Sequence, residues 1–473
     1  SGIKEGDVLV LQDATTNSYN TYRNYHEGEF IQVAGISGTT LTLVNPLYGN
    51  YIADHIANCH IYKYNMHTCK VANGNFAMQR SGSVSERTLI RGYALINSEI
   101  SSIVGDGIDI NVALELSYNC EVSKCVFHND LVTYSGRQLD QYGVTIANSQ
   151  FVNVWQIHGV CGNHIVCITG TTIVSRFVNF IDCSGDTGKD NYYGMNTHGC
   201  GEYITFLRCQ TNGIDLGGDY LTLQDCIINP NRNPGIAISL YEITGYNIKI
   251  ENCEIKGLIH NRNTTMSGVN RTLAKHTFTM HNCRWENTGA SELCRRTAFD
   301  EPVEVLIDGC TLKGTSGSMQ IGATTFVYKI SNCQIYDFLF NIYKVERISF
   351  INNYIKNSSV GRLINTNNNG VAIQEFAMIG NEFESESSYK DISLLYMGAA
   401  CPLMRIENNL IKKLNGSGFV LECSGTSVWA EKAVVNDNTW WINSNYAKIR
   451  ATTFYNDNNF LIGTAGHLLL ETT

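Results

Sequence analysis

Apolar and polar residues alternate in short segments along almost the whole chain. Two examples are GIDLGGDYLTLQDC at 213–226 and GIAISLYEITGYNIKIENC at 235–253. A period of two predicts β-strands with one buried face, because successive side chains of a strand point to opposite sides. No segment combines a helical period with a capped start. The pattern therefore predicts an all-β protein built from many short strands.

A short phrase ends most groups of strands: an apolar residue, two polar residues, then Cys, Asn or Ser, one further residue and an apolar residue. Sixteen copies run from weak ones at Gly74 and Ser98 to a last one at Asn458. They recur about every 26 residues, which is typical of stacked repeats. In the other copies the central position is occupied by Cys125, Ser149, Cys183, Cys209, Cys226, Cys253, Cys283, Cys310, Cys333, Asn353, Asn381, Asn409 and Asn438.

We expect these repeats to form a right-handed parallel β-helix over residues 65–473, in which each coil lays its strands on those of the coil before. A β-propeller is the alternative, but its blades need about 40–45 residues. Residues 1–64 have a different pattern, which predicts a small β module with a hairpin centred on Ser37 and Gly38. Because terminal repeats usually need a cap and none precedes the first coil, we expect the chain to be part of a longer protein.

Charge and composition limit the possible partners. The net charge of −9 argues against nucleic acid, because phosphate binding requires clustered Lys and Arg. No apolar run approaches the ~20 residues that span a bilayer, so we expect no membrane insertion.

The 17 cysteines do not resemble a disulfide framework. Most stand at the same point of the repeat, where a chain of equivalent neighbours offers no unique pairing and Cys serves as a small buried hydrophobe. We therefore expect reduced thiols in a protein made in a cytoplasm, and stacked amides where Asn replaces Cys. No CxxC pair is matched by a second pair or by spaced His, so we expect no metal and no cofactor.

Three stretches break the repeat and should form loops on one face: 129–143, 184–193 and 258–276. Aligning strands by a leading glycine places Asp109, Asn196, Asp215 and Ala237 at equivalent outward positions, with His198 two residues after Asn196. Acids lie at the ends of the same strands, and the 184–193 loop adds acids, a lysine and tyrosines. We expect catalysis from Asp215, Glu242, Glu202, His198 and Asp219, and substrate contacts from Asp186, Lys189, Asp190, Tyr192, Tyr193, Asn196, Tyr241 and Arg262.

Two carboxylates that flank a glycosidic oxygen are the chemistry of glycoside hydrolysis, one as the acid and the other as base or nucleophile. Adjacent coils lie ~4.8 Å apart, close to the ~5–5.5 Å of retaining enzymes, whereas two coils approach the ~6.5–9.5 Å of inverting ones. Asp215 with Glu242 is an adjacent pair, and Glu202 with Glu242 is a two-coil pair. The competing interpretation is that these acids are solvated surface residues and that His198 bonds a backbone carbonyl.

The chain resembles the pectate-lyase-like β-helices of phage tailspikes and capsule depolymerases. The matching features are the NCxI/NNxI phrase, the GDGIDI strand (105–110), YYGMNTHGCGEYITF (192–206) and the GEFIQV…TLTLVNPLY module. The resemblance implies a homotrimeric spike of the virion tail that is made in the host cytoplasm and acts outside the cell, where it binds and cleaves bacterial surface polysaccharide.

Hydrolysis is the expected reaction, and three alternatives remain open. A polysaccharide lyase would use Lys189, His198 or Arg208 to remove a proton beside a uronate carboxyl. A phage-appendage phosphodiesterase would cleave teichoic acid, and a spike without catalytic activity would only bind glycan. The paired Asp and the Arg-x-Lys segment of polygalacturonase-like hydrolases are not found in the expected order, so that family's catalytic residues are not transferred.

Overall fold

The structure is a computed structural model. It describes residues 2–15, 25–49, 51, 53–77, 88–128, 133–134, 137–138, 141–170, 172–187, 193–230, 235–243, 247–261, 276–293, 303–314, 318–322, 327–358, 363–366, 373–386, 392–395, 401–413, 421–424, 430–442, 446–463 and 467–472. The chain forms two compact units: the first consists mainly of the residues before position 233 with Ile238–Asn247, and the second mainly of those from position 248 onward.

The first unit begins with a four-stranded antiparallel sheet in the order β3-β2-β1-β4. Its strands are β1 (Val8–Asp13), β2 (Gly28–Ser37), β3 (Thr40–Leu43) and β4 (Cys59–Tyr62), and the short 3₁₀ helix η1 (Ala53–Asn58) precedes β4. The predicted hairpin is confirmed, because Ser37 pairs with Thr40 across a turn in which Gly38 has a φ of 61°. The first parallel strand follows at Lys70; the boundary at residue 64 stays a prediction.

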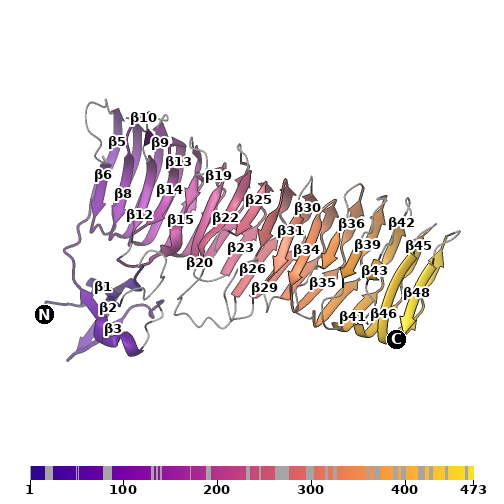
Figure 1. The fold of residues 1–473 in the computed structure, drawn as a ribbon. Coiled ribbons are helices and arrows are strands. Elements are labelled where there is room, and N and C mark those ends of the chain that lie inside the picture. The colour runs from indigo at the N-terminus through magenta and orange to yellow at the C-terminus, as the bar shows by residue number, and fades with distance from the viewer. Residues whose placement is uncertain are drawn as a thin grey trace. The chain divides into compact units, whose positions relative to one another are not determined.

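Parallel strands make up the rest of the first unit and lie side by side in successive coils (Figure 1). One ladder contains β6 (Thr88–Tyr93), β8 (Ile110–Glu115), β12 (Tyr142–Ala147), β14 (His164–Thr169), β17 (Met195–Asn196), the start of β20 (Ile214–Gln224) and β22 (Ile236–Ile243). A second contains β5 (Lys70–Ala77), β7 (Glu99–Asp106), β9 (Tyr118–His128), β13 (Gln150–Cys161), β15 (Ser175–Ile181), β18 (Gly201–Leu207) and the end of β20. A third joins the end of β13 to β16 (Ser184–Thr187), β19 (Gln210–Thr211) and β21 (Ile227–Ile228). The short hairpin of β10 (Thr133–Tyr134) and β11 (Arg137–Gln138) lies outside the ladders.

The alternation seen in the sequence forms the core of these coils. In the first ladder, side chains in register from coil to coil are wholly buried, which removes apolar surface from water and stabilises the fold. One such column consists of Val112, Val144, Val166, Met195, Ile214 and Ile238. The predicted all-β parallel β-helix is confirmed.

The second unit repeats the same three-strand coil. Its ladders run from β24 (Glu254–Lys256) to β47 (Phe460–Ile462), from β25 (Leu258–Asn261) to β48 (His467–Thr472), and from β26 (His276–His281) to β46 (Tyr446–Asp457). Within the described residues, no helix is both long and apolar enough to cross a bilayer.

The repeated phrase forms a hydrogen-bonded column inside the second unit. The backbone N–H of Cys253 donates to Cys283 Sγ at 3.4 Å, and the same contact recurs between Cys310 and Cys333. Where Asn takes over, Asn381 accepts from Asn353 N at 3.0 Å, and its own Nδ2 donates to Asn409 Oδ1 at 2.9 Å. The stacked amides expected from the sequence are therefore confirmed, and the 15 cysteines whose side chains the structure describes are free thiols.

The residue just before the central position of the phrase turns the chain. It has a left-handed φ of 48–63° in the copies with Asp or Asn there, residues that tolerate this conformation better than other L-residues: Asn73, Asn97, Asn148, Asp182, Asp225, Asn252, Asn282, Asn332, Asn352, Asn408 and Asp437. The last copy corrects the predicted register by one residue. Asn458, with a φ of 51°, is the turning residue, and Asn459 accepts from Asn438 N at 3.1 Å in the central position.

Candidate functional site

Asn196 and Asp215 lie on adjacent strands of the first ladder. They are register partners between β17 and β20, as the sequence predicts. The flanking Ile214 and Leu216 are in the core, so Asp215 faces away from it. Asp215 is nevertheless only 7% exposed, because the 3₁₀ turn η2 (His198–Cys200) packs against β20 and β14. The site is therefore recessed rather than an open strand face.

The predicted alignment fails for two strands. Ser239, not Ala237, pairs with Asp215, and Ala113, not Asp109, belongs to the column that continues through Thr145 and Cys167. GDGIDI is also not one strand, since β7 ends at Asp106 and β8 begins at Ile110. A slip of two or four residues preserves the period-two alternation, so the hydrophobic pattern alone does not detect it.

The Asn196 side chain connects the polar groups of this recess. Its Oδ1 accepts from the backbone N–H of His198 at 2.6 Å, which fixes the start of the η2 turn. Its Nδ2 lies 3.4 Å from Asp215 Oδ2 and 3.2 Å from His164 Nε2. One amide thus holds a carboxylate, an imidazole and a turn in one arrangement.

The sequence analysis missed His164 and Cys167, both on β14. His164 Nδ1 lies 2.6 Å from the carbonyl oxygen of Tyr193, and its ring meets that of His198 edge-on at 6.0 Å. Cys167 is the register partner of Asn196. The nitrogen and sulfur atoms of His164, Cys167 and His198 converge within 4.8 Å of one another, a grouping that can hold a metal ion. The grouping depends on the register of β14. The sequence did not show that register, because no leading glycine marks this strand.

Glu202 lies in a buried ion cluster. Its Oε2 accepts from Arg176 Nε at 2.6 Å, and the same guanidinium binds Glu27 and the carbonyl of Gly28 in the N-terminal sheet. The three charged side chains are at most 1% exposed. Burial acts to lower the pKa of Arg176, but the carboxylates of Glu202 and Glu27 outweigh it and raise this pKa above its ordinary value. The cluster joins the N-terminal sheet to the coils.

Asp219 is also fully buried, and it is the register partner of Glu202. Its Oδ1 accepts from Tyr220 N at 2.8 Å and from Asn247 Nδ2 at 3.0 Å. The two acids are closed to solvent in this structure, and a catalytic role for either stays a prediction.

The other candidates are only partly described. Asp186 is half-buried on β16, and Tyr193 is buried with its carbonyl against His164. Tyr241 and Glu242 lie on β22, which pairs with β20, but their side chains are outside the described part. Lys189, Asp190, Tyr192 and Arg262 lie outside the described residues.

A column of aromatic side chains, also missed from the sequence, crosses the second ladder. Phe151, Phe177, Tyr203 and Tyr220 are in register, and consecutive rings stack at 4.9, 4.9 and 4.5 Å with interplanar angles of at most 11°. All four have φ between 51° and 58°, which is costly for bulky L-residues. The surrounding structure therefore holds these rings at a strained position that turns them out of the core; Tyr220 is 37% exposed.

The residue before each ring is polar and buried: Gln150, Arg176, Glu202 and Asp219. A polar residue followed by an aromatic one, recurring in successive coils, is thus the sequence signal for the column. Alternation counting conceals it, because the left-handed residue shifts the phase of each strand. Tyr48, from the segment after β3, covers Phe177 edge-on at 4.7 Å. Glu29 holds Tyr48 there by accepting from its backbone N–H at 3.0 Å.

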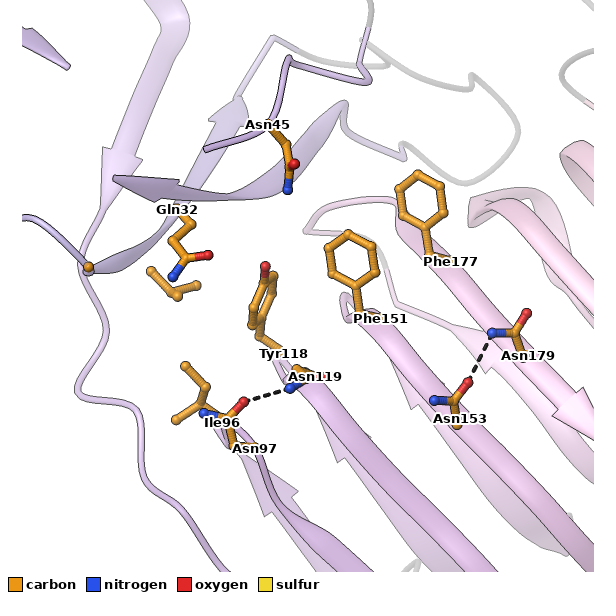
Figure 2. Close-up of a pocket in the computed structure, with 12 residues that line it drawn as sticks. Gln32, Asn45, Ile96, Asn97, Tyr118, Asn119, Phe151, Asn153, Phe177 and Asn179 are labelled. Carbon is orange, nitrogen blue, oxygen red and sulfur yellow. Dashed lines mark hydrogen bonds between the residues drawn. The ribbon is translucent and has the colours of Figure 1, made fainter. Parts of the chain in front are cut away.

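The rings of Phe151 and Phe177 line a pocket of about 780 Å³ between the N-terminal module and the first coils. Figure 2 shows these rings beside Tyr118, with Gln32 and Asn45 across the opening. Two amide pairs complete the wall: Asn119 donates to Asn97 at 2.7 Å, and Asn179 to Asn153 at 2.9 Å. Apolar ring edges beside exposed amide donors and acceptors suit a ligand that has both apolar surface and hydroxyl groups.

Comparisons with known proteins agree with this architecture. Residues 107–328 match the protein family described as Gp49, pectin lyase-like. The tailspike gp61 of Pseudomonas phage phi297 has a TM-score of 0.51 at 14% identity, over 86% of this chain and 58% of that one. The tailspike protein gp49 of Pseudomonas phage LKA1 has a TM-score of 0.49 at 15% identity, over 91% and 63%.

A third structure is the gp54 tailspike of Acinetobacter baumannii bacteriophage AP22, in complex with A. baumannii capsular saccharide. It has a TM-score of 0.43 at 17% identity, over 91% of this chain and 62% of that one. This chain thus spans about six-tenths of the length of these tailspikes. No curated protein matches it. The comparisons confirm the resemblance to phage tailspikes with a pectate-lyase-like parallel β-helix.

Proposed function

We propose that this chain is the glycan-binding and glycan-cleaving β-helix of a phage tailspike, with bacterial surface polysaccharide as its substrate. The observation that carries the proposal is the column of four stacked rings, which continues from the pocket lined by Phe151 and Phe177. The strained backbone holds the rings without a ligand, so little ordering free energy remains to be lost on binding. The similarity to tailspikes supports a virion location, production in the host cytoplasm and a homotrimer as parts of the same proposal.

We place cleavage at Asp215, with Glu242 on the adjacent strand as its partner. One carboxyl group protonates the glycosidic oxygen, and the other acts as base or nucleophile. Asn196 and His198 support Asp215 through the hydrogen bonds described above. Tyr220 follows Asp215 by five residues on β20, so their Cα atoms are at most about 17 Å apart. An oligosaccharide chain can span that distance from the rings to the acid.

A lyase is the second candidate. His198 is half-buried in the otherwise closed recess beside Asn196, where it is placed to remove a proton next to a uronate carboxyl. The products distinguish the two reactions, because a lyase leaves an unsaturated end that absorbs ultraviolet light and a hydrolase leaves a new reducing end without it.

The test uses purified surface polysaccharides from Pseudomonas and Acinetobacter strains, with viscosity, new reducing ends and ultraviolet absorbance as readouts. We expect viscosity to fall without an absorbance rise, and Asp215→Asn to slow cleavage about 100-fold or more. Asp225→Asn, an exposed acid at a phrase turn, is the matched control and should retain full activity. Binding without any change in viscosity would indicate an adhesive spike. Phosphate-bearing fragments released in a separate incubation with purified teichoic acid would indicate a phosphodiesterase. Full activity of Asp215→Asn would overturn the assigned site.

A further inference from the structure

We propose that His164, Cys167 and His198 form a binding site for a divalent transition-metal ion of the zinc class. The three side chains come from β14 and the η2 turn of the first unit. The inference goes beyond the proposed function and does not depend on it, because metal binding is measured without a polysaccharide.

The ligand atoms are already gathered. The candidate nitrogen and sulfur atoms of the three side chains lie within 4.8 Å of one another. Zinc binds His nitrogen at about 2.0–2.1 Å and Cys sulfur at about 2.3 Å. Small side-chain rotations are therefore enough to enclose an ion, with no movement of the β14 backbone.

The orientation of His164 fits a metal ligand. Its Nδ1 is 2.6 Å from the carbonyl oxygen of Tyr193, which assigns the proton to Nδ1 and leaves the Nε2 lone pair directed into the recess. Histidine ligands characteristically donate their second ring N–H to a carbonyl or carboxylate, which fixes the tautomer and the ring. Asn196 Nδ2, 3.2 Å from Nε2, occupies the direction from which the ion would bind and would turn aside.

Burial gives the site a closed side and an open side. Cys167 is 1% exposed and His164 is 3% exposed, whereas His198 is half-buried. Three protein ligands with one accessible position match zinc sites that keep a water or substrate in the fourth place. The carboxyl group of Asp215 lies next to the site, with its Oδ2 3.4 Å from Asn196 Nδ2.

Binding requires the thiolate of Cys167. Its Sγ–H now donates to the carbonyl oxygen of Ile168 at 3.3 Å. As the metal–sulfur bond forms, the S–H bond breaks and the proton passes to the solvent, so one proton is released for each ion bound. The electron pair of the S–H bond becomes the metal–sulfur bond, and no oxidant or reductant takes part.

The buried thiols of the repeated phrase, such as Cys183 and Cys209, donate to backbone carbonyls as Cys167 does. Cys167 is distinguished by the two imidazoles beside it. Among the described residues, His164, Cys167 and His198 form the group of metal-binding side chains whose ligand atoms converge. The sequence indicated no metal because the ligands come from two segments without CxxC spacing.

The test measures metal content and coordination directly. The purified protein is stripped with a chelator, dialysed and titrated with Zn²⁺ and, separately, with Co²⁺. We expect about one ion per chain, with a sulfur-to-cobalt charge-transfer band in the near ultraviolet. Cys167→Ser should abolish that band, and His198→Ala should weaken Zn²⁺ binding about 100-fold or more. Cys183→Ser and His158→Asn, which alter a buried thiol and an exposed imidazole elsewhere in the first unit, should bind as the parent does.

Thermal unfolding checks that each variant is folded. If Cys167→Ser does not fold, His164→Gln provides a second test, in which Zn²⁺ binding should weaken. No stoichiometric binding by the folded parent would overturn the proposal, and so would a cobalt spectrum that Cys167→Ser leaves unchanged. A parent protein that binds Zn²⁺ but has no depolymerase activity would contradict only the proposed function. A metal-bound His198 is not a free base, so metal binding also argues against the lyase mechanism.

Discussion

Left-handed backbone positions recur along the coils, and the side chain at each one decides what the coil presents to solvent. At most of the phrase turns the residue is Asp or Asn, for which this conformation costs little. In the second ladder it is Phe or Tyr at four successive positions, where it costs about 1–2 kcal/mol each. The rings form one column beside a pocket, which supports the binding role proposed for them.

Phe177→Asn tests this directly. The change relieves the strained φ, at about 1–2 kcal/mol, but removes two ring stacks and the edge-on contact with Tyr48, at about 0.5–1.5 kcal/mol each. The loss is larger than the gain, so the melting temperature should fall slightly. Polysaccharide binding should weaken about tenfold or more, as measured by calorimetry with the cleaved polymer. Phe460→Asn, at an exposed ring of the second unit, should leave binding unchanged. If Phe177→Asn bound polysaccharide as tightly as the parent, a binding role for the rings would be contradicted.

Cys125 gives a pH dependence at the same scale. Burial raises the pKa of this thiol to about 11 from an ordinary value near 9. The folded state therefore holds its proton more tightly than the unfolded state, and the stabilisation is complete below pH 9 and is lost as the pH rises towards 11. The denaturant midpoint of the parent should fall across this range more steeply than that of Cys125→Ala. Parallel pH profiles would contradict the assignment.

At the scale of the element, the column of Cys and Asn side chains explains why a short polar phrase is compatible with a buried position. Asn381 donates to Phe350 O and Asn409 Oδ1 and accepts from Asn353 N and Nδ2, all at 2.9–3.0 Å. Every polar atom of the amide is thereby paired, which is the condition for burying it. A thiol makes fewer bonds but has less polar surface to satisfy.

Asn381→Ala should therefore destabilise the protein by more than a cavity alone would. It leaves partners above and below without their bonds, at about 1–3 kcal/mol for each buried group. Urea unfolding of the second unit, followed by hydrogen exchange of its amides, measures the loss. Gln334→Ala, which removes an exposed amide from the same unit, should change stability by less than about 0.5 kcal/mol. Similar effects of the two substitutions would contradict this role for the column.

At the scale of the whole molecule, the buried ion cluster determines how the N-terminal sheet joins the coils of the first unit. Arg176 is fully buried between Glu27, the residue before β2, and Glu202 of the coil. Removing one member of such a cluster leaves uncompensated charge, at about 3–5 kcal/mol. Arg176→Met should therefore lower the melting temperature clearly and increase proteolysis of residues 1–64. Arg208→Met, which breaks the exposed pair with Asp182, should cost no more than about 1 kcal/mol.

The sequence predicted the fold because alternation and repeat length are encoded in every coil. It also placed Asn196 beside Asp215, where two strands with leading glycines align. It misplaced Ala237 by two residues, and it missed His164, Cys167 and the aromatic column. These features depend on strand register and on left-handed residues, which alter the phase of a strand without changing its composition. Register is set by packing between coils that are distant in sequence.

A structure of the Asp215→Asn protein with a bound fragment of its polysaccharide tests the central claim most directly. The account predicts a sugar ring against Tyr220, the exposed end of the ring column, and a glycosidic oxygen within hydrogen-bonding distance of residue 215. Sugar bound only on the second unit, or away from both the rings and residue 215, would contradict it.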